Sequence, residues 1–247
     1  MVHRNIKLLI LLPLLLVCTA LSAVGEYKTC MFGTAIPNTG IHVYASSVAL
    51  FSRIKDLPGK DRGSLQTDKT GLVAYVKVLP KLEVSLAMTT ANDDQEFQLQ
   101  AKYLFWNEDN MYISVAPTFN THDGSMFHNY SSPYKNWREK CRISGIGIPL
   151  IYTFDTQRNL YVTVSACFNY SNVQIWGSYQ PQSPYDAPYE SYSFNDLPVY
   201  STLLNFSLEA KYKPLSIIPE VGIISFDAHD QGVQQLINYG MSFGLRW

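Results

Sequence analysis

The feature that most constrains this chain is a regular alternation of apolar and polar residues, which begins near residue 71 and continues to the carboxyl end. Successive side chains of a β-strand point to opposite faces, so a period of two predicts strands with one apolar and one polar face. The alternating segments run to about ten residues or more, whereas strands of soluble sheets usually have about five or six. The pattern therefore predicts an all-β chain of unusually long strands.

Ten segments of this kind can be placed along the sequence. They cover residues 41–53, 71–79, 81–91, 94–107, 111–121, 142–154, 159–171, 201–213, 216–228 and 235–247. Long connections (54–70, 122–141 and 172–200) follow only odd-numbered strands, and every connection after an even-numbered strand is short. Outer-membrane barrels show this parity, with short periplasmic turns at one rim and longer external loops at the other. The sequence therefore predicts an antiparallel transmembrane β-barrel of about ten strands over residues 41–247, with both chain ends in the periplasm.

In such a barrel the polar strand faces point inward. They carry Lys77, Glu83, Gln98, Gln100, Lys102, Glu209, Lys211 and Arg246. A ten-stranded barrel is wider than one of eight strands and far narrower than a 16-stranded porin. These residues therefore either pair across strands as buried structural charges or line a narrow path for polar solutes. A soluble lipocalin-like barrel or β-sandwich is the alternative fold, but it predicts neither the long strands nor the polar inner faces.

The first 22 residues have the pattern of a secretory signal peptide. His3, Arg4 and Lys7 precede ten apolar residues, 8–17, and small residues follow at 20 and 22. The apolar run has about half the length that a membrane-spanning helix needs. We expect cleavage after Ser22 or Ala23, which leaves residues 23–40 as a periplasmic segment and sends the chain to the outer membrane. Acylation of Cys18 is a further alternative.

The last strand carries the most specific motif. Tyr239, Met241, Phe243, Leu245 and the terminal Trp247 alternate with small or polar residues. This segment resembles the terminal β-signal of bacterial outer-membrane proteins, in which the commonest last residue is Phe. The resemblance implies that these five residues are read by the barrel-assembly machinery.

Two of the long connections have distinctive compositions. The connection 172–200 holds Tyr179, Tyr185, Tyr189 and Tyr192 together with four prolines, and it has acids but no Lys or Arg. Tyrosine gives amphipathic contact at low entropy cost, so this connection suits either binding of a surface ligand or packing over the barrel mouth. The connection 122–141 holds the bases Lys135, Arg138 and Lys140. These bases suit either contact with outer-membrane lipid, such as the phosphates of lipopolysaccharide, or plain solvation.

One group of residues in the sequence suggests catalysis. Asp93 and Asp94 fall at one loop, and Asp227, His229 and Asp230 fall at another loop of the same rim. Acids facing a histidine across a barrel mouth can activate a water molecule. This arrangement is similar to that of omptins, which are ten-stranded outer-membrane proteases, but only the Asp-x-His spacing corresponds.

The composition excludes some of the remaining classes of protein function. A net charge of −1 excludes a strongly basic nucleic-acid binder. The four cysteines form no metal-binding spacing, so we expect no metal and no cofactor; a disulfide between Cys141 and Cys167 is left open. The leading expectation is a small channel for polar solutes. The alternative is a non-conducting adhesin or binding platform that uses the tyrosine-rich connection, and an omptin-like hydrolase comes third.

Overall fold

The computed structural model describes residues 33–50, 67–91, 94–124, 134–181, 190–227 and 233–247, all as strands and connections. The strands are β1 (Gly40–Leu50), β2 (Thr67–Leu79), β3 (Leu82–Ala91), β4 (Asp94–Glu108), β5 (Met111–Val115), β6 (Thr118–Gly124), β7 (Tyr134–Asp155), β8 (Leu160–Pro181), β9 (Glu190–Tyr212), β10 (Leu215–Asp227) and β11 (Val233–Arg246). Within these ranges no helix is long and apolar enough to cross a membrane. The signal peptide expected at 1–22 lies outside the described residues.

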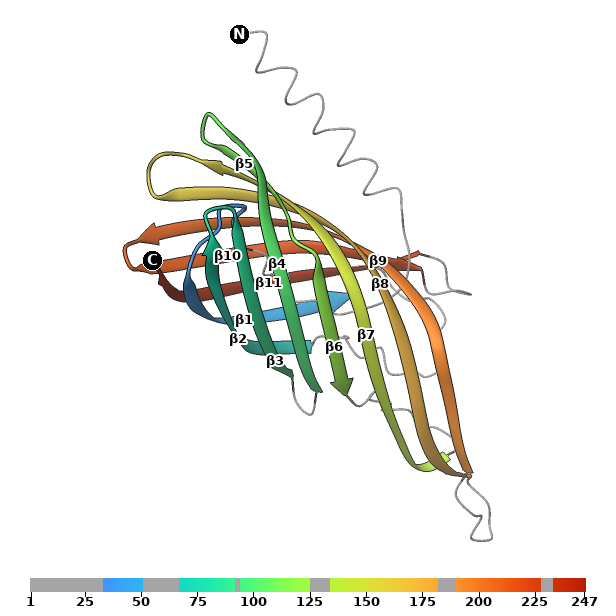
Figure 1. The fold of residues 1–247 in the computed structure, drawn as a ribbon. Coiled ribbons are helices and arrows are strands. Elements are labelled where there is room, and N and C mark those ends of the chain that lie inside the picture. Colours follow the sequence, from blue (N-terminus) through green and yellow to red (C-terminus); the bar gives the residue numbers. More distant parts are fainter. Residues whose placement is uncertain (1–32, 51–66, 92–93, 125–133, 182–189, 228–232) are drawn as a thin grey trace.

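The strands close into an antiparallel barrel (Figure 1). Closure is made by β1, which pairs with β2 on one side and with β11 on the other, in register from Gly40–Arg246 to Leu50–Leu236. β5 and β6 occupy one place in the wall, because both pair with β4 on one side and with β7 on the other. The wall therefore has ten strands, and the fold predicted from the alternation is confirmed.

The expected single strand 111–121 is divided by Pro117. A proline has no N–H to give to the ladder, so it interrupts a strand even where the alternation of side chains continues. The flanking bonds hold the wall together here: Ala101 N donates to Pro117 O at 3.1 Å, and Ala116 N donates to Pro149 O at 2.9 Å. The alternation passes through the break unchanged, with Ser114 and Thr118 buried and Phe119 exposed.

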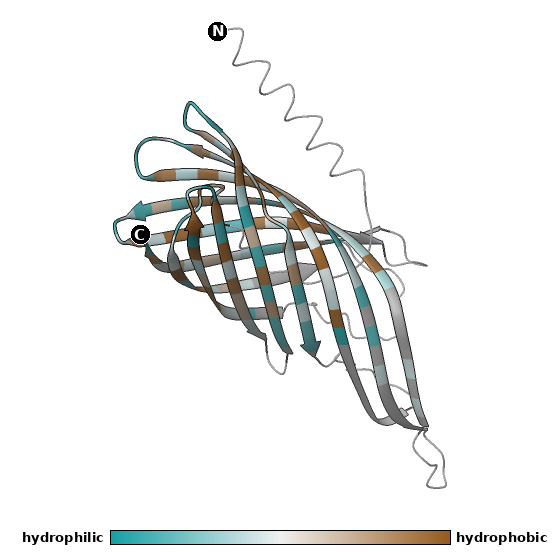
Figure 2. Cartoon of the chain, viewed as in Figure 1, coloured by the Kyte–Doolittle hydropathy of each residue, from teal (hydrophilic) through white to brown (hydrophobic). Residues whose placement is uncertain are grey.

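Hydrophobic and hydrophilic residues alternate along the wall strands (Figure 2), and the bulky apolar ones are exposed, so the apolar face of the wall points outward. On β8 this face runs from Leu160 to Tyr170, and a strand of that length tilted by roughly 40° rises about 25 Å, which is the height of the apolar band of outer-membrane barrels. Bulky apolar side chains around the barrel remain exposed, among them Val43, Leu99, Ile148, Ile223 and Phe243. A bilayer is the environment that covers such a band.

Three strands extend far beyond this band on one side of the barrel. β7 and β8 have 22 residues each and β9 has 23. We call residues 134–141, 171–181 and 190–199 the extension; its strands remain paired out to Tyr134–Pro181 and Tyr179–Glu190. Figure 1 shows it leaving the barrel at the end opposite the short turns.

Because of the extension, the strands expected at 142–154, 159–171 and 201–213 are longer than the sequence predicts. Most of the expected loops 122–141 and 172–200 is strand, and only 125–133 and 182–189 lie outside the described residues. Strands above the bilayer need no apolar face, so a period of two cannot reveal them. The tyrosines, prolines and serines of this region gave loop signals, although the backbone continues its ladder.

The outward apolar band can be tested by placing a charge in it. Leu99→Arg, on the exposed face of β4, should lower the free energy of unfolding by about 2–4 kcal/mol, because an Arg at membrane depth loses its hydration. Leu79→Arg, at the exposed turn end of β2, is the matched control and should cost about 0–1 kcal/mol. Urea titration in lipid vesicles measures both, and equal costs would contradict the placement of the band.

Candidate functional site

The base of the barrel is filled by the segment that precedes β1. We call residues 33–39 the plug. Thr34 and Ala35 are buried, and Ala35 N donates to Thr153 Oγ1 at 2.7 Å. On the facing wall, Lys102 Nζ donates to Thr34 O at 2.8 Å. The plug thus satisfies its own backbone groups with inward side chains of strands that lie far from it in sequence.

Two buried ion pairs hold the wall around the plug. Lys102 Nζ lies 2.7 Å from Glu83 Oε1, and Glu83 Oε2 accepts a bond of 2.8 Å from the plug's Asn38 N. The second pair joins Arg246 to Glu209. Arg246 Nη2 also donates to Thr34 Oγ1 at 2.8 Å. Buried charges are stable only when paired and hydrogen-bonded, so the plug supplies partners that both pairs need.

Little open space remains between plug and wall. A cavity of about 40 Å³ lies there, bordered by Ile36, His42, Tyr75, Gln100 and Arg246 among others. Two buried polar atoms at its border, Gln100 Nε2 and Arg246 Nε, have no hydrogen-bond partner among the described residues. A cavity of this size suits a bound water, not a solute in transit. Among the described residues, the plug therefore fills most of the base of the barrel.

A second polar layer lies toward the opposite rim. Lys69 Nζ and Glu96 Oε2 form a buried ion pair of 3.0 Å between β2 and β4. Tyr44 on β1 is hydrogen-bonded to Thr89 on β3. Sequence analysis named neither Lys69 nor Glu96 as interior residues. The alternation of the strands indicates both as inward residues, since Glu96 is in phase with Gln98 and Lys69 is in phase with Lys77.

The residues expected along the lumen have three different environments. Glu83, Gln98, Gln100, Lys102, Glu209 and Arg246 are buried in the interior. Lys211 is half-buried at the turn end, and Lys77 is exposed there. Glu83–Lys102 is a direct register pair, whereas Glu209 and Arg246 reach each other across β10, where Ser216 Oγ donates to Glu209 Oε1 at 2.7 Å. Their role in a solute path stays a prediction.

His42 and Tyr75 also belong to the base and were missed by sequence analysis. Tyr75 Oη lies 2.8 Å from His42 Nε2, and His42 Nδ1 lies 3.2 Å from Ser242 Oγ. Their rings lie over two wall glycines, Gly244 and Gly40, at which an added Cβ would clash with backbone and ring. Glycine at those places leaves room for the two rings beside the backbone of the seam between β1 and β11.

The residues of the proposed assembly signal lie on the outer face. Tyr239, Met241, Phe243, Leu245 and Trp247 are all exposed. The last residue is fixed by backbone bonds to the end of the plug, with Trp247 N donating to Thr39 O at 2.9 Å. Reading by the assembly machinery stays a prediction.

The residues expected in loops are only partly described. Tyr179 belongs to β8, Tyr192 to β9, and Lys135, Arg138 and Lys140 to β7, while Tyr185 and Tyr189 lie outside the described residues. Of the suggested catalytic group, Asp94 and Asp227 are end residues of β4 and β10, and Asp93, His229 and Asp230 are outside the described part. Among described residues, no group of His, Cys, Asp and Glu could hold a metal ion.

The disulfide left open between Cys141 and Cys167 is not formed. Cys167 is buried, and its thiol donates to Asn169 Oδ1 at 2.9 Å. Cys141 is in register with Ile175, eight residues further along β8 than Cys167. Since a strand rises about 3.3 Å per residue, the two cysteines are far outside bonding reach.

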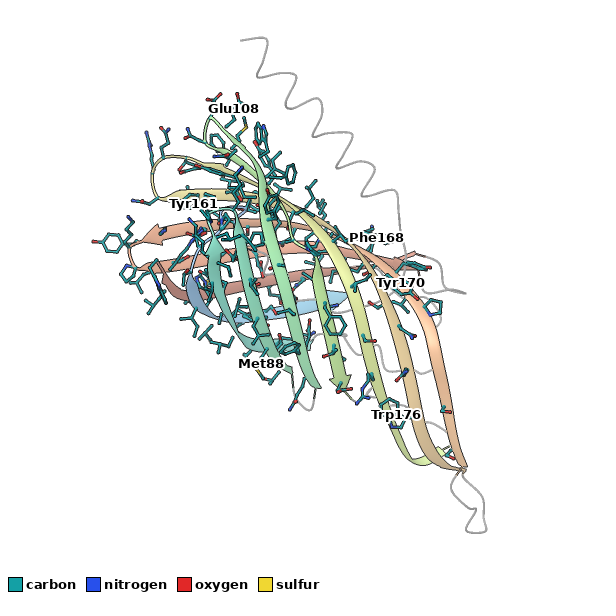
Figure 3. All side chains as sticks on the ribbon, in the orientation of Figure 1. Met88, Glu108, Tyr161, Phe168, Tyr170 and Trp176 are labelled. Atoms are coloured by element: carbon teal, nitrogen blue, oxygen red, sulfur yellow. The ribbon has the colours of Figure 1, made fainter. Side chains whose placement is uncertain are left out.

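The outer face at the foot of the extension is aromatic. The ring centroid of Tyr200 lies 6.2 Å from that of Phe168 and 5.1 Å from that of Tyr170, so the three rings form one cluster. Figure 3 labels Phe168 and Tyr170 on β8. Further out, Arg142 lies 6.0 Å from the Trp176 ring and is paired with Asp123 at 2.6 Å. Aromatic girdles of this kind mark the interface between lipid tails and water.

Comparison with known proteins finds outer-membrane barrels. The outer-membrane protease OmpT from Escherichia coli is 13% identical over 89% of this chain and 99% of its own, with a TM-score of 0.47. Ail, the attachment invasion locus protein of Yersinia pestis, is 11% identical over 86% and 99%, with a TM-score of 0.36. Neisserial surface protein A is 12% identical over 83% and 95%, with a TM-score of 0.33. Likeness at this level assigns no function.

The sequence itself has no match among families or curated proteins. No family model matches it, and no curated protein matches it either.

The buried pair Glu209–Arg246 can be tested with a mutant cycle. Arg246→Met leaves Glu209 as an uncompensated buried charge and should lower the free energy of unfolding by about 3–5 kcal/mol. Adding Glu209→Gln removes that charge and should restore most of the loss. Urea unfolding of the two single variants and the double variant measures the coupling. A double variant as unstable as the sum of the single ones would contradict a direct pair.

The plug can be tested by removing it. A chain that lacks residues 23–38 loses the groups bonded to Lys102, Glu83 and Arg246 and should conduct ions after refolding into planar bilayers, whereas the chain with the plug should be silent. Heat-modifiable mobility on a gel is the control for folding. A folded, plug-deleted chain that stays silent would show that the wall side chains alone close the base.

Proposed function

We propose that this protein is an exported outer-membrane barrel that acts at the cell surface as a binding platform, with the extension as its binding element. The observation that carries the proposal is the length of β7, β8 and β9, whose 22 to 23 residues each are about twice the nine to eleven that cross a membrane. Strand beyond that length is not needed to span the bilayer. It holds a rigid surface away from the lipid on the side opposite the periplasmic turns.

The extension offers features that suit recognition. Before Cys141 no described strand other than β8 pairs with β7, and before Ser201 no described strand other than β8 pairs with β9. Both edges thus present backbone N–H and C=O groups, to which an extended partner segment can add as a further strand. The sequence of this region is rich in tyrosine, a residue type that gives contact surface at low entropy cost. A three-stranded sheet also loses less entropy on binding than a free loop would.

The plugged base favours a role as a binding platform and not a role as a channel. Solute crossing the barrel would have to displace the plug and break its bonds to Lys102, Arg246 and Thr153. The channel expected first from the sequence remains the second candidate, because the inner face of the wall is polar along most of its length. A mobile plug would reconcile that polar face with transport.

The proposal is tested by shortening the extension. Residues 174–196 are deleted and Val173 is joined by Asn-Gly to Leu197, its register partner on β9. The barrel wall is untouched, so heat-modifiable mobility should be retained. Cells that display the shortened chain should lose retention on immobilised polysaccharide, matrix protein and serum protein, down to the level of cells without the protein.

A second variant distinguishes binding by the tyrosine side chains from binding by the backbone of the strand edges. Changing Tyr179, Tyr185, Tyr189 and Tyr192 to Ser keeps the strand edges and removes the rings. Loss of retention in this variant would assign binding to the tyrosines, and retained binding would assign it to the edges. Unchanged retention in the shortened chain, together with steady conductance of the intact chain in planar bilayers, would overturn the platform in favour of the channel.

A further inference from the structure

A large groove lies on the outer surface of the barrel at its turn end. It encloses about 860 Å³ between the turn that joins β7 to β8 and the turn that joins β9 to β10. These two turns lie at the same end of the barrel (Figure 1). The groove is lined by Thr156, Arg158, Asn159, Leu160, Ala210, Lys211, Tyr212, Leu215 and Ile217. It is separate from the plug and from the extension.

The floor of the groove is made by a small residue between larger ones. Ala210 on β9 is in register with Leu160 on β8 and with Ile217 on β10. All three belong to the outward apolar face of the wall. The missing side-chain volume at Ala210 leaves a depression between two branched aliphatic chains. Leu215 and the highly exposed ring of Tyr212 continue the apolar surface toward the rim. A depression of this kind fits an acyl chain.

The rim of the groove is cationic and held in a fixed shape. The turn between β7 and β8 contains two residues in the left-handed region, Gln157 at φ 62° and Asn159 at φ 59°, with Arg158 between them. Gln157 N donates to Asp155 Oδ1 at 2.7 Å, and Thr156 N donates to Leu160 O at 3.0 Å. These bonds fix the backbone that carries the Arg158 side chain at the rim.

The neighbouring turn brings further positive charge. Lys211 N donates to Asn159 O at 2.8 Å, so the two turns are joined directly. Lys213 follows on the exposed turn. Asp155 is the acid nearest this rim in sequence, and one of its oxygens already accepts the bond from Gln157. The polar end of the groove therefore suits a phosphate group.

We propose that this groove binds one anionic glycerophospholipid of the periplasmic leaflet. Its phosphate lies at Arg158 on the cationic rim, and one acyl chain lies over Ala210 between Leu160 and Ile217. The short turns place the groove at the periplasmic rim, where the leaflet consists of glycerophospholipid, and the cations favour a headgroup with net negative charge. The inference depends on the transmembrane fold and not on the binding role of the extension.

The test is retention of lipid by the folded, full mature chain. The protein is moved into mild detergent with equal amounts of phosphatidylglycerol, phosphatidylcholine and lipopolysaccharide, and bound lipid is counted by native mass spectrometry. One phosphatidylglycerol should remain bound. Ala210→Phe, which fills the floor, and Arg158→Glu, which reverses the rim charge, should each reduce its retention by roughly tenfold, the effect of losing one charge-assisted contact or its equivalent.

Ala74→Phe is the matched control for the filled groove. Ala74 is an exposed alanine on the outward face of β2, on another part of the wall, so this variant should retain lipid as the native chain does. Heat-modifiable mobility confirms that each variant is folded. Retention of all three lipids in equal amounts, retention of lipopolysaccharide alone, or unchanged retention in both groove variants would each overturn the proposal.

Discussion

The whole structure depends on one constraint: inside a bilayer no water is present to bond backbone N–H and C=O groups. A sheet meets this constraint only when it has no edge, so the first and last strands must pair. β1 and β11 do so over eleven register positions, and the break at Pro117 is bridged because β5 and β6 share neighbours on both sides. Closure also fixes which way side chains point, since each strand must turn alternate residues to the lipid. The long alternation of apolar and polar residues thus reflects strands that have one face toward lipid and one toward the barrel interior.

Closure has a consequence for the interior. Ten strands enclose a narrow space in which inward charges cannot reach bulk water, so each needs several partners. Wall residues supply one partner for Lys102 and one for Arg246, namely Glu83 and Glu209. The plug supplies more through Thr34, whose carbonyl and hydroxyl groups accept bonds from these two cations. A segment without regular structure therefore completes the polar core of the barrel, and the plugged base follows from the need to satisfy buried charge.

The alternation along the sequence predicts the structural features that repeat from strand to strand, but not those that occur once. The strands of the wall follow from alternation, and the pair Glu83–Lys102 follows from inward parity on adjacent strands. Glu209–Arg246 does not, because the two residues are separated by β10 and their meeting depends on side-chain reach over Ser216. The plug has no periodicity, so residues 23–40 could only be assigned to the periplasm. The extension was missed because its tyrosines, prolines and serines are typical of loops, although its backbone continues the ladders of β7, β8 and β9.

The same strands connect the two outward features of this barrel. β8 and β9 form the extension at one end and, with β10, the floor of the lipid groove at the other. A rigid sheet that projects from one side of a barrel transmits any force on its tip to the strands that carry it, and those strands are joined to their neighbours by continuous ladders. A lipid held against Leu160, Ala210 and Ile217 would add contacts at the opposite end of these strands. Those contacts would oppose tilting of the barrel in the membrane. Binding at the surface and anchoring in the periplasmic leaflet would then be two ends of one mechanical element.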